Sequence, residues 1–421
     1  NINTNDVLSL GITNQRETVV FWDKNTLKPI GNAISWQCLR GIKICEEMKG
    51  SNFEDTFNSS TGLKIDPYFS FSKIKWALDN NKEISASIKN KTLQIGTVDS
   101  WILANLTENR ESKIEISNAS RTGLFNTKKE DWDEDLLSFL DIDKSVFPKV
   151  CNSDEIFGYT KKSLFGKSIG INAILGDQQS SLYGHNEGNK FEIKCTYGTG
   201  GFLLIDTNKK RFGFNKNFLS TIAYRKENKT KFALEGSILS AGSTLEWLRK
   251  INILDNFENI EDQLNATKAN DVMFIPALNG LGAPFWDGNV RGSIENVSSG
   301  TTKEEIIRSA FEAIAFSTKA IIETIEKTIN LQINELKIDG GLSKSSFFSQ
   351  YLADLIGKKV KASKNSEMTS LGVAKLSFEK SGISPDIKNS YNEYNPKNDK
   401  QNIYLDKYKK WKKLIEKKIK N

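Results

Sequence analysis

The chain of 421 residues contains one histidine, His185, and four cysteines that lie far apart, Cys38, Cys45, Cys151 and Cys195. A single imidazole excludes histidine-rich metal sites, and only His185 is available for a histidine-based triad. No C-x-x-C pair occurs, so the cysteines favour reduced thiols in a cytoplasmic protein over disulfides or a zinc site. We expect His185 to be structural or to lie on the surface.

The sequence also lacks long apolar runs. No stretch of about 18 apolar residues predicts a transmembrane helix, so we expect no membrane insertion. The first residues, NINTNDVLSLG, have neither the basic start nor the apolar stretch of a signal peptide. Hydrophobic residues make up 38% of the chain, and 421 residues are too many for one ordinary core. The length and composition therefore predict two domains.

The net charge of +7 does not indicate a nucleic-acid-binding protein. The last stretch, KYKKWKKLIEKKIKN from Lys407, holds eight lysines and one glutamate, which account for the whole excess. The remaining residues, 1–406, are formally neutral and offer no electrostatic footprint for a polyanion. Tyr404, Tyr408, Trp411, Ile415 and Ile419 form one apolar helical stripe. A membrane-surface or partner helix is one interpretation; we expect instead a C-terminal helix docked on its own domain.

Strand and helix signals alternate through most of the sequence, which predicts an α/β fold. The clearest helix begins at Thr301, where Thr302 and Glu305 form a capping box, and a second begins near Ser240. A polar break with glycines places a domain boundary near Gly188. Strand-like runs begin at Ser9, Val19, Thr92, Ile171, Phe202, Asp271 and Glu335.

The stretch ILGDQQSS places Asp177 and Gln178 at the carboxyl end of a buried strand, after the turn at Gly176. Ligands gather at such strand ends in open α/β sheets. A carboxylate there can hold Mg²⁺ or accept a proton from a substrate hydroxyl. The alternative is that Asp177 only caps a helix beginning near Gln179, and from this stretch alone the cap is the stronger interpretation.

Two further strand ends are marked by glycines. TYGTGGFLL is consistent with a tight hairpin, or with backbone N–H groups and the Thr199 hydroxyl placed near phosphate oxygens. KIDGGLSKSS, with Asp339 and Gly341, reads as a strand followed by a helix start, which is an anion site in many proteins. Neither is a Walker sequence, but three such turns together favour a nucleotide-binding protein.

The stretch ITNQRE loads what we expect to be a β-turn between two strands with Arg16 and Glu17. These two residues are also consistent with an exposed ion pair of little worth. Trp36 in SWQC and Tyr68 in DPYFSFSKIKW are likewise consistent with ordinary core residues.

Taken together, these stretches resemble the glycerol kinases of the FGGY carbohydrate kinase family. The similarity covers residues 9 to 374 in the family's order, and NQRE with WQC is specific to the glycerol branch. The stretches that carry it are GITNQRETVVFWDKNTLKPIGNAISWQCLRG, TGLKIDPYFSFSKIKW, ISNASRTGLFN, GDQQSSLYG, TYGTGGFLL, LEGSILSAGSTLEWLR, ALNGLGAPFWDGNVRGSI, IDGGLSKSSFFSQYLADLIG and TSLGVA.

The resemblance implies two ribonuclease-H-like (actin/hexokinase-type) α/β domains facing a cleft, residues 1–187 for glycerol and 188–421 for nucleotide. It implies ATP-dependent phosphorylation of glycerol to sn-glycerol 3-phosphate, with ATP and Mg²⁺, and no nucleic acid. Asp177 would be the catalytic base and the metal contact. The other implied glycerol-binding residues are Arg16, Glu17, Trp36, Tyr68, Gln178 and Phe202, and the implied nucleotide-binding residues are Thr199, Gly242, Glu246, Gly341 and Ser345. Members are often oligomers, so a homo-oligomer is a further expectation.

The sequence departs from the family's pattern at three places. It begins without the first strand and Gly-Thr-Thr phosphate loop, and Glu246 and Ser345 stand where the family usually has Gln and Asn. Two alternatives to a glycerol kinase therefore stay open. One is another polyol or sugar kinase of the family. The other is a truncated, catalytically silent chain that binds glycerol without turnover.

Overall fold

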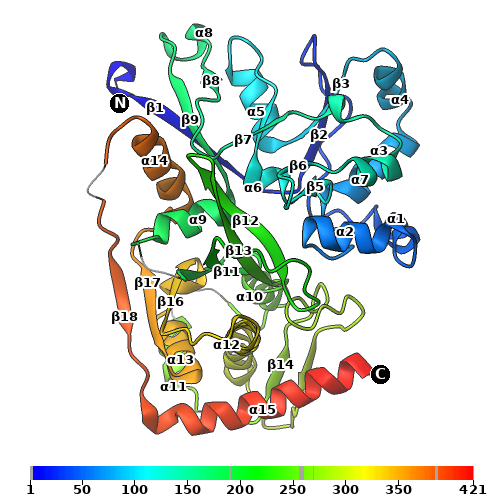
Figure 1. Cartoon of the computed structure of the whole chain (residues 1–421). Helices are drawn as coiled ribbons and strands as arrows, with labels where there is room; N and C mark the ends of the chain where they lie inside the picture. Colours follow the sequence, from blue (N-terminus) through cyan, green and yellow to red (C-terminus); the bar gives the residue numbers. More distant parts are fainter. Residues whose placement is uncertain (1–2, 189–190, 256–259, 269, 385–386, 421) are drawn as a thin grey trace. The chain divides into compact units, whose positions relative to one another are not determined.

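A computed structural model describes residues 3–188, 191–255, 260–268, 270–384 and 387–420. The chain forms two compact units, each built from several segments (Figure 1). Unit 1 comprises residues 1–191, 206–234 and 369–387, and unit 2 comprises residues 192–205, 235–368 and 388–421. Both units combine strands and helices, so the predicted α/β class is confirmed. The polar break near Gly188 includes residues 189 and 190, which lie outside the described residues.

The sheet whose strands lead to Arg16 and Asp177 lies in unit 1 and has the order β1-β9-β8. Strand β1 (Ser9–Asn14) runs parallel to β9 (Gly170–Gly176), and Asn14 is the partner of Gly176 at their carboxyl ends. Strand β8 (Gly158–Tyr159) is antiparallel to β9. Apolar side chains of this sheet form a core cluster with helix α5 (Val98–Leu106), namely Ile12, Leu103, Cys151, Phe157, Ile171 and Ile174.

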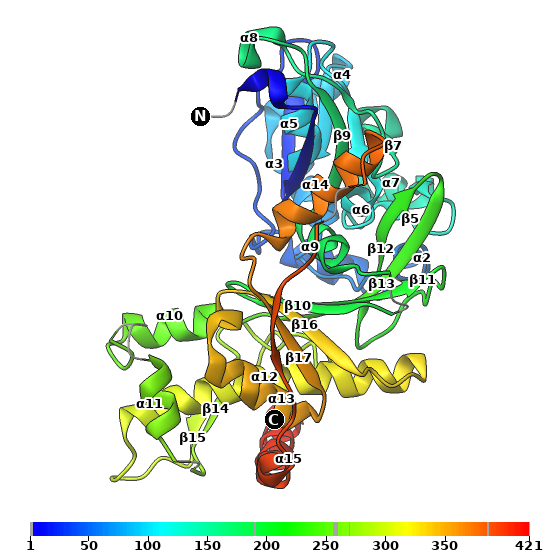
Figure 2. The ribbon, with the colours of Figure 1, turned by 90° about the vertical axis from the view of Figure 1, so that its left-hand side faces the viewer.

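Helix α14 (Met368–Lys380) lies against strand β1, beside β9 in Figure 2. The Ser377 hydroxyl donates to the carbonyl oxygen of Leu10, and a Cβ at Gly11 would lie 2.9 Å from Val373. Gly11 therefore allows a close approach of helix and strand.

The predicted turn between the first two strands is not a hairpin. Strand β2 (Val19–Asp23) pairs antiparallel with β3 (Leu93–Thr97), whereas β1 pairs with β9. Glu17 has a positive φ of 58°, and the Thr18 N–H donates to the Arg16 carbonyl at 2.6 Å. This tight reversal sends β2 into a different sheet.

Unit 1 contains further short elements around these sheets. Buried aromatic side chains join them, for example Phe57 with Phe71 at 4.8 Å between ring centroids. The elements are η1 (Thr4–Asp6), α1 (Ile42–Met48), α2 (Phe53–Thr61), α3 (Ser70–Asn80), α4 (Lys82–Lys89), β4 (Lys113–Glu115), α6 (Ile116–Ala119), β5 (Phe125–Asn126), β6 (Asp131–Trp132), α7 (Glu134–Leu140), η2 (Lys144–Val146), β7 (Lys149–Cys151), α8 (Lys162–Phe165), α9 (Asp177–His185) and β12 (Leu219–Lys226).

The core of unit 2 is a mixed sheet. Strand β10 (Ile193–Tyr197) pairs antiparallel with β11 (Gly201–Asn208) and parallel with β16 (Glu335–Gly340). Strand β17 (Lys359–Ser363) continues the sheet in parallel, and β18 (Tyr391–Tyr394) is antiparallel to it. The remaining elements are β13 (Lys229–Ile238), which begins in unit 1, α10 (Gly242–Lys250), α11 (Ile260–Ala266), β14 (Met273–Ile275), β15 (Ser293–Glu295), η3 (Leu342–Lys344) and α13 (Ser346–Ile356).

The predicted long helix is confirmed as α12 (Lys303–Ile329). Thr302 is its N-cap, and the reciprocal hydrogen bonds of a capping box join Thr302 and Glu305. Its largely buried face carries Ile307, Ala310, Phe311, Ile314 and Ile321. A capping box combined with a 3.6-residue apolar period is local information, which explains why the sequence predicts this helix well.

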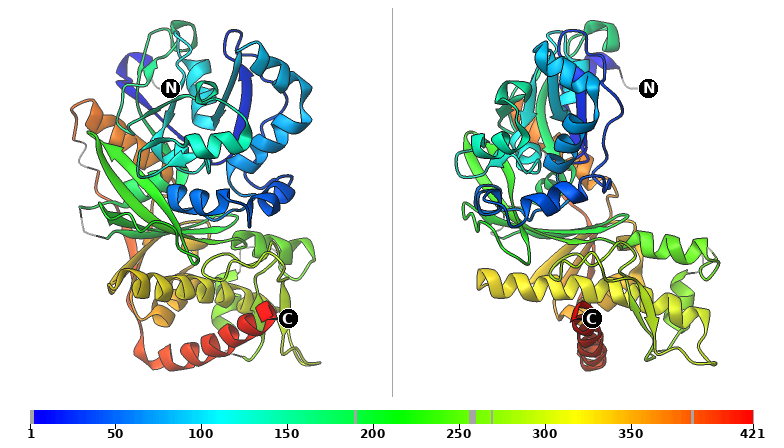
Figure 3. Two further views of the ribbon diagram at one scale, coloured as in Figure 1. Left: turned by 45° about the vertical axis from the view of Figure 1, so that its right-hand side comes forward. Right: turned by 90° about the vertical axis from the view of Figure 1, so that its right-hand side faces the viewer.

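The basic tail forms helix α15 (Asn398–Lys420), which packs on unit 2 as expected (Figure 3). Trp411 is completely buried, and its indole N–H donates to the carbonyl oxygen of Phe274 at 2.9 Å. Its ring contacts Phe316 of α12. The lysines on the opposite face are exposed, so the stripe serves packing within this unit.

No helix among the described residues is long and apolar enough to cross a membrane. The four cysteines are free thiols, and Cys45, Cys151 and Cys195 are buried. His185, at the end of α9, is completely buried, which agrees with a structural role rather than a surface position.

Candidate active site

Arg16 and Glu17 follow β1 directly and are both buried, with 2% of each side chain exposed. They are therefore not the exposed ion pair that was one interpretation of ITNQRE. Gly176, at the end of the neighbouring strand, lies directly beside the Arg16 side chain. A Cβ at this position would lie 2.9 Å from Arg16 Cγ, so a larger residue would displace the arginine.

The Arg16 guanidinium contacts helix α9, the loop that carries Tyr68, and the adjacent Glu17, all in unit 1. Nη1 donates to Gln179 Oε1 at 3.2 Å, and Nη2 donates to the Tyr68 hydroxyl at 3.4 Å. Nε lies 3.4 Å from Asp177 Oδ1 and 3.8 Å from Glu17 Oε1. The structure thus brings together four residues predicted for glycerol, namely Arg16, Glu17, Tyr68 and Asp177.

Glu17 has a second cationic partner that the sequence did not single out. Arg121 is fully buried, and its Nε lies 2.6 Å from Glu17 Oε1. The same guanidinium stacks 5.6 Å from the Tyr68 ring centroid and 5.2 Å from that of Phe69. The signal for Arg121 was present in the NASRT stretch, but that stretch lies about a hundred residues beyond Glu17.

The aromatic residues predicted for this site also lie together. The Trp36 and Tyr68 rings meet edge to face, with 5.5 Å between centroids. The Trp36 N–H donates to Thr18 Oγ1 at 3.1 Å, which ties SWQC to the segment that carries Arg16. Both rings are only half-buried, so neither is an ordinary core residue as the alternative interpretation had it.

Lys73, which was not predicted, holds the loop that carries Tyr68. Its completely buried ammonium donates to the carbonyl oxygens of Pro67, Tyr68 and Phe69. Burial lowers the pKa of Lys73 to about 8, and the nearby carboxylate of Glu17 opposes that shift. The three carbonyl contacts fix the loop in place and so fix the Tyr68 ring beside Arg16.

Helix α9 begins at Asp177, two residues earlier than the sequence predicted, with Gly176 as its N-cap. Asp177 is therefore not the N-cap itself, which weakens the interpretation of this residue as a cap. Its Oδ1 accepts the Gln178 N–H at 2.7 Å, and its Oδ2 accepts the Gln178 side-chain amide at 3.3 Å. One third of the Asp177 side chain is exposed, so it can reach a ligand.

The residues predicted for nucleotide lie in unit 2, as does Phe202 on β11. The predicted hairpin is confirmed, since the Gly198 N–H donates to the Gly200 carbonyl at 2.9 Å between β10 and β11. The N–H of Gly242, at the start of α10, donates to the Gly198 carbonyl at 3.0 Å. A Cβ at Gly242 would lie 2.5 Å from that oxygen, so only glycine fits there.

Of the remaining nucleotide candidates, Gly341 and Ser345 are the N-caps of η3 and α13, and Glu246 lies within α10. The Gly341 N–H donates to the Tyr197 carbonyl at 2.8 Å, and Ser345 is the N-cap of α13, accepting from the Phe348 N–H at 3.1 Å. Glu246 forms an exposed ion pair with Arg249 at 2.7 Å. These two residues line a pocket of about 480 Å³ with Ser243, Trp247 and Lys250.

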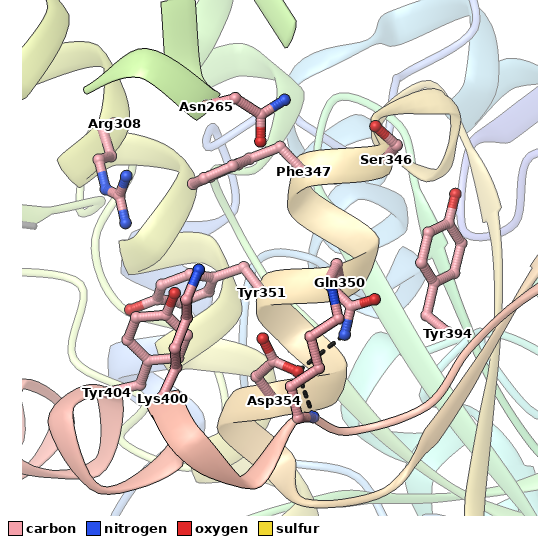
Figure 4. Close-up of a pocket in the computed structure, with 11 residues that line it drawn as sticks. Asn265, Arg308, Ser346, Phe347, Gln350, Tyr351, Asp354, Tyr394, Lys400 and Tyr404 are labelled. Carbon is pink, nitrogen blue, oxygen red and sulfur yellow. Dashed lines mark hydrogen bonds between the residues drawn. The ribbon is translucent and has the colours of Figure 1, made fainter. Parts of the chain in front are cut away.

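A second pocket of unit 2, of about 320 Å³, contains none of the predicted site residues (Figure 4). It lies along α13, and its cationic residues are Arg308, Lys397 and Lys400. The Arg308 guanidinium is already bonded to Glu312 at 2.9 Å and to the Leu264 carbonyl at 3.2 Å, which ties α12 to α11. Asp354 of α13 accepts from the Gln350 side chain and from the Lys397 N–H, both at 2.7 Å, which ties α13 to the chain before α15.

Among the described residues, no group of three or more His, Cys, Asp or Glu side chains is arranged to hold a metal ion. Of the two carboxylates beside Arg16, Glu17 is buried and bonded to Arg121, whereas Asp177 is one third exposed and can reach a metal ion. One carboxylate fits Mg²⁺, which keeps several waters and commonly binds through one or two carboxylates plus phosphate oxygens of a substrate.

Comparison with known proteins defines the class of this protein. Residues 1–184 match the N-terminal domain, and residues 193–378 the C-terminal domain, of the FGGY family of carbohydrate kinases. The chain belongs to this family, and it has the family's two-domain actin-like α/β fold.

Similar curated proteins include several glycerol kinases. The chain is 42% identical to glycerol kinase 2 of Thermotoga maritima over 89% of its own length and 76% of that protein. It is 40% identical to the glycerol kinase of a Thermoanaerobacter species over 100% of its length and 86% of that protein. These relatives share the branch that NQRE and WQC indicated.

Solved structures agree with the sequence comparisons. Plasmodium falciparum glycerol kinase with ADP superposes with a TM-score of 0.89 at 34% identity, over 98% of this chain and 84% of that one. A gluconate kinase from Lactobacillus acidophilus superposes with a TM-score of 0.85 at 21% identity, over 99% and 86% of the two chains. The second comparison supports the fold alone.

Proposed function

We propose that this protein phosphorylates glycerol with ATP, producing sn-glycerol 3-phosphate. The observation that supports the proposal most is the cluster in unit 1 that joins buried Arg16 and Glu17 to the more exposed Tyr68 and Asp177. The glycerol kinases among its relatives, one of them solved with ADP, add to it.

Glycerol is small and uncharged, so only directional hydrogen bonds distinguish it from other solutes. Arg16 supplies donors, and Glu17 and Asp177 supply acceptors. Hydrogen bonds to charged groups are about twice as strong as neutral ones. A site built to bond each hydroxyl can reject an analogue that lacks one by about 10⁴-fold or more. In this proposal the Trp36 and Tyr68 rings cover the carbon face of glycerol.

Asp177 would accept the proton of the glycerol hydroxyl that attacks the γ-phosphoryl group. A general base contributes about 10²–10⁴-fold to such a step. The Arg16 guanidinium, whose Nε lies 3.4 Å from Asp177 Oδ1, orients this carboxylate. Mg²⁺ bound at Asp177 would supply neutralisation of the phosphate charge.

In unit 2, we propose that Thr199, Gly242, Glu246, Gly341 and Ser345 bind the nucleotide. Backbone contacts at Gly242 and Thr199 bring two glycine-marked turns together. Backbone N–H groups in such turns form concave sites for phosphate oxygens. The Glu246 carboxylate is offset by Arg249, so the glutamate does not leave an unpaired negative charge on this surface.

The test is ADP formation by the purified chain with glycerol, xylulose or gluconate as the acceptor. We expect turnover with glycerol and a rate with the other two at least about 100-fold lower. Preference for xylulose or gluconate would show that the protein is another kinase of the family. Calorimetry on the same sample separates the remaining alternative, because a silent chain would bind glycerol with measurable heat and release no ADP.

A further inference from the structure

A network of buried hydrogen bonds in unit 1 lies behind the strand ends that carry Arg16 and Asp177. At its centre is Glu115, the last residue of β4, whose side chain is completely buried. Oε1 accepts the Ser153 hydroxyl at 2.5 Å, and Oε2 accepts the Ser117 hydroxyl at 2.5 Å. Oε2 also accepts from the Asn118 backbone N–H at 3.1 Å and from its side-chain amide at 3.4 Å. All four of these groups donate, which is the arrangement that suits an ionised carboxylate.

Two of these donors, Ser117 and Asn118, are also hydrogen-bonded to the ends of β9 and β1. The Ser117 oxygen accepts the Gly176 N–H at 3.2 Å, directly before Asp177. The Asn118 amide exchanges hydrogen bonds with the Asn14 amide at 3.0 and 3.2 Å. Asn14 in turn donates to the Gln15 carbonyl at 2.9 Å, directly before Arg16. One carboxylate thus orients both side chains that hold the ends of β1 and β9.

We propose that Glu115 is a positioning residue, whose ionised carboxylate holds Ser117 and Asn118 so that Arg16 and Asp177 stand in their working geometry. This proposal deepens the proposed function and rests on it. The Glu115 carboxylate accepts from Ser117, Asn118 and Ser153 rather than from Arg16, so it acts on Arg16 and Asp177 through the two strand ends.

The hydrogen bonds of Ser153 and Ser117 explain why the negative charge of Glu115 matters. The Ser153 oxygen already accepts the Arg225 N–H at 3.0 Å, and the Ser117 oxygen already accepts the Gly176 N–H. Each hydroxyl therefore has its own proton available for Glu115. If Glu115 is protonated or replaced by Gln, the new hydrogen must point at one of these buried donors. Ser117 and Asn118 then hold the ends of β9 and β1 less firmly.

Among the residues that the structure describes, the charged and titratable neighbours of Glu115 do not supply a compensating cation. On α5, Asp99 Oδ2 accepts the Glu115 N–H at 3.2 Å, and Cys151 on β7 is its register partner. Arg225 on β12 directs its guanidinium to Glu130, at 2.9 Å. Burial raises the pKa of Glu115 to about 7, and that of Asp99 to about 6, against the opposing hydrogen bonds of their neighbours. Below about pH 7, Glu115 therefore loses its charge and its firm hold on Ser117 and Asn118.

The test compares Glu115→Gln, Glu115→Asp and Ser117→Ala with Leu103→Ala. Leu103 is completely buried in the apolar cluster behind the same strands and makes no polar link to their ends, so this variant controls for lost stability. We expect Glu115→Gln and Ser117→Ala to lower kcat for glycerol at least tenfold, with the affinity for ADP unchanged. The double variant Glu115→Gln/Ser117→Ala should be no worse than either single variant, because both break one chain of contacts. Leu103→Ala should lower Tm and leave kcat near that of the parent.

The pH profile and a conservative variant give the second readout. The parent's kcat should fall on the acidic side with a midpoint near pH 7, and Glu115→Gln should lose that limb. Glu115→Asp keeps a carboxylate and should retain the limb with a kcat above that of Glu115→Gln. Equal kcat values and equal pH profiles in Glu115→Gln and Leu103→Ala would overturn the proposal.

Hydrogen exchange of the Gly176 amide separates this proposal from the proposed function. We expect exchange at least tenfold faster in Glu115→Gln and Ser117→Ala than in Leu103→Ala, whatever the substrate. If the parent phosphorylates no acceptor of the panel, the proposed function fails and exchange alone decides the role of Glu115. Exchange equal to that of Leu103→Ala would overturn the positioning role even in an active enzyme.

Discussion

Two buried arginines lie beside Glu17, and we expect replacement of Arg16 by methionine mainly to weaken glycerol binding and replacement of Arg121 mainly to lower stability. Arg16→Met removes the guanidinium that contacts Tyr68, Asp177 and Gln179 and keeps an unbranched stem of similar length. Glu17 retains Arg121 at 2.6 Å, and Asp177 is one third exposed to water. No carboxylate is therefore left buried without a cation. We expect a loss of only about 1–2 kcal/mol in the free energy of unfolding, because the hydrogen bonds to Gln179 and Tyr68 are long, at 3.2 and 3.4 Å, and water can reach the half-buried Tyr68.

The effect of Arg16→Met on binding should be larger. A hydrogen bond to a charged group is worth about 1.5–3 kcal/mol, so the Kd for glycerol should rise about 10- to 100-fold. The Kd for ADP should stay within about twofold of the parent, since Arg16 belongs to unit 1 and the nucleotide candidates belong to unit 2. Calorimetric titration with each ligand measures both constants.

Arg121→Met is the matched variant. It removes the closer of the two arginines from Glu17, whose side chain is 2% exposed, and leaves Arg16 at 3.8 Å. Removing one partner of a buried ion pair costs about 3–5 kcal/mol. For a unit of this size that corresponds to a fall in Tm of about 6–20 °C, which differential scanning fluorimetry resolves. The reasoning is refuted if Arg16→Met destabilises the protein as much as Arg121→Met, or if it weakens ADP binding and spares glycerol.

The remaining predictions concern catalysis, the nucleotide, the tail and pH. Asp177→Asn should lower kcat at least about 10³-fold with a nearly unchanged Tm, because Asn can still accept the Gln178 N–H; unfolding with an unchanged rate in the folded fraction would instead mark Asp177 as structural. Glu246→Gln should change the calorimetric Kd for ADP less than about fivefold, since exposed ion pairs are worth about 0–1 kcal/mol. Trp411→Ala should cost about 3–5 kcal/mol in a urea titration without changing the Kd for glycerol, since this side chain is completely buried. The Glu115 carboxyl has a pKa of 4.5 in the unfolded chain and about 7 in the fold, so the unfolded state binds fewer protons between these values. The parent's stability should therefore fall by about 3 kcal/mol relative to Glu115→Gln as pH rises from about 4.5 to about 7, and parallel stability curves would contradict this.

The sequence predicts elements whose signals are local. The capping box at Thr302 and Glu305, the glycine hairpin at Gly198 and the apolar stripe around Trp411 all appear where expected. In each case the sequence signal lies in residues that are only a few positions apart. Arg16, Glu17, Tyr68 and Asp177 were predicted through the family's motifs, and the structure gathers them around one guanidinium.

What the sequence does not reveal is the partner of each local feature. Alternation predicts that residues 9–14 and 19–23 are strands, but it does not show that they pair with β9 and β3 rather than with each other. Arg121 meets Glu17 across 104 positions, and Lys73 holds the Tyr68 loop through backbone carbonyls that no motif encodes. Such contacts depend on tertiary packing, which has no signature in spacing or composition.

Glu115 shows why such hidden residues matter for a kinase site. An ionised carboxylate buried without a cation costs stability, and here the burial raises the pKa of Glu115 to about 7. Packing alone would be served as well by an apolar residue. The carboxylate, however, is the acceptor that gives the Ser117 and Asn118 side chains one orientation each, and these side chains hold the two strands that end at Arg16 and Asp177. Stability and activity are therefore expected to respond to pH in opposite directions between about pH 5 and 7. A structural carboxylate with no role in positioning would lower stability over that range without raising kcat.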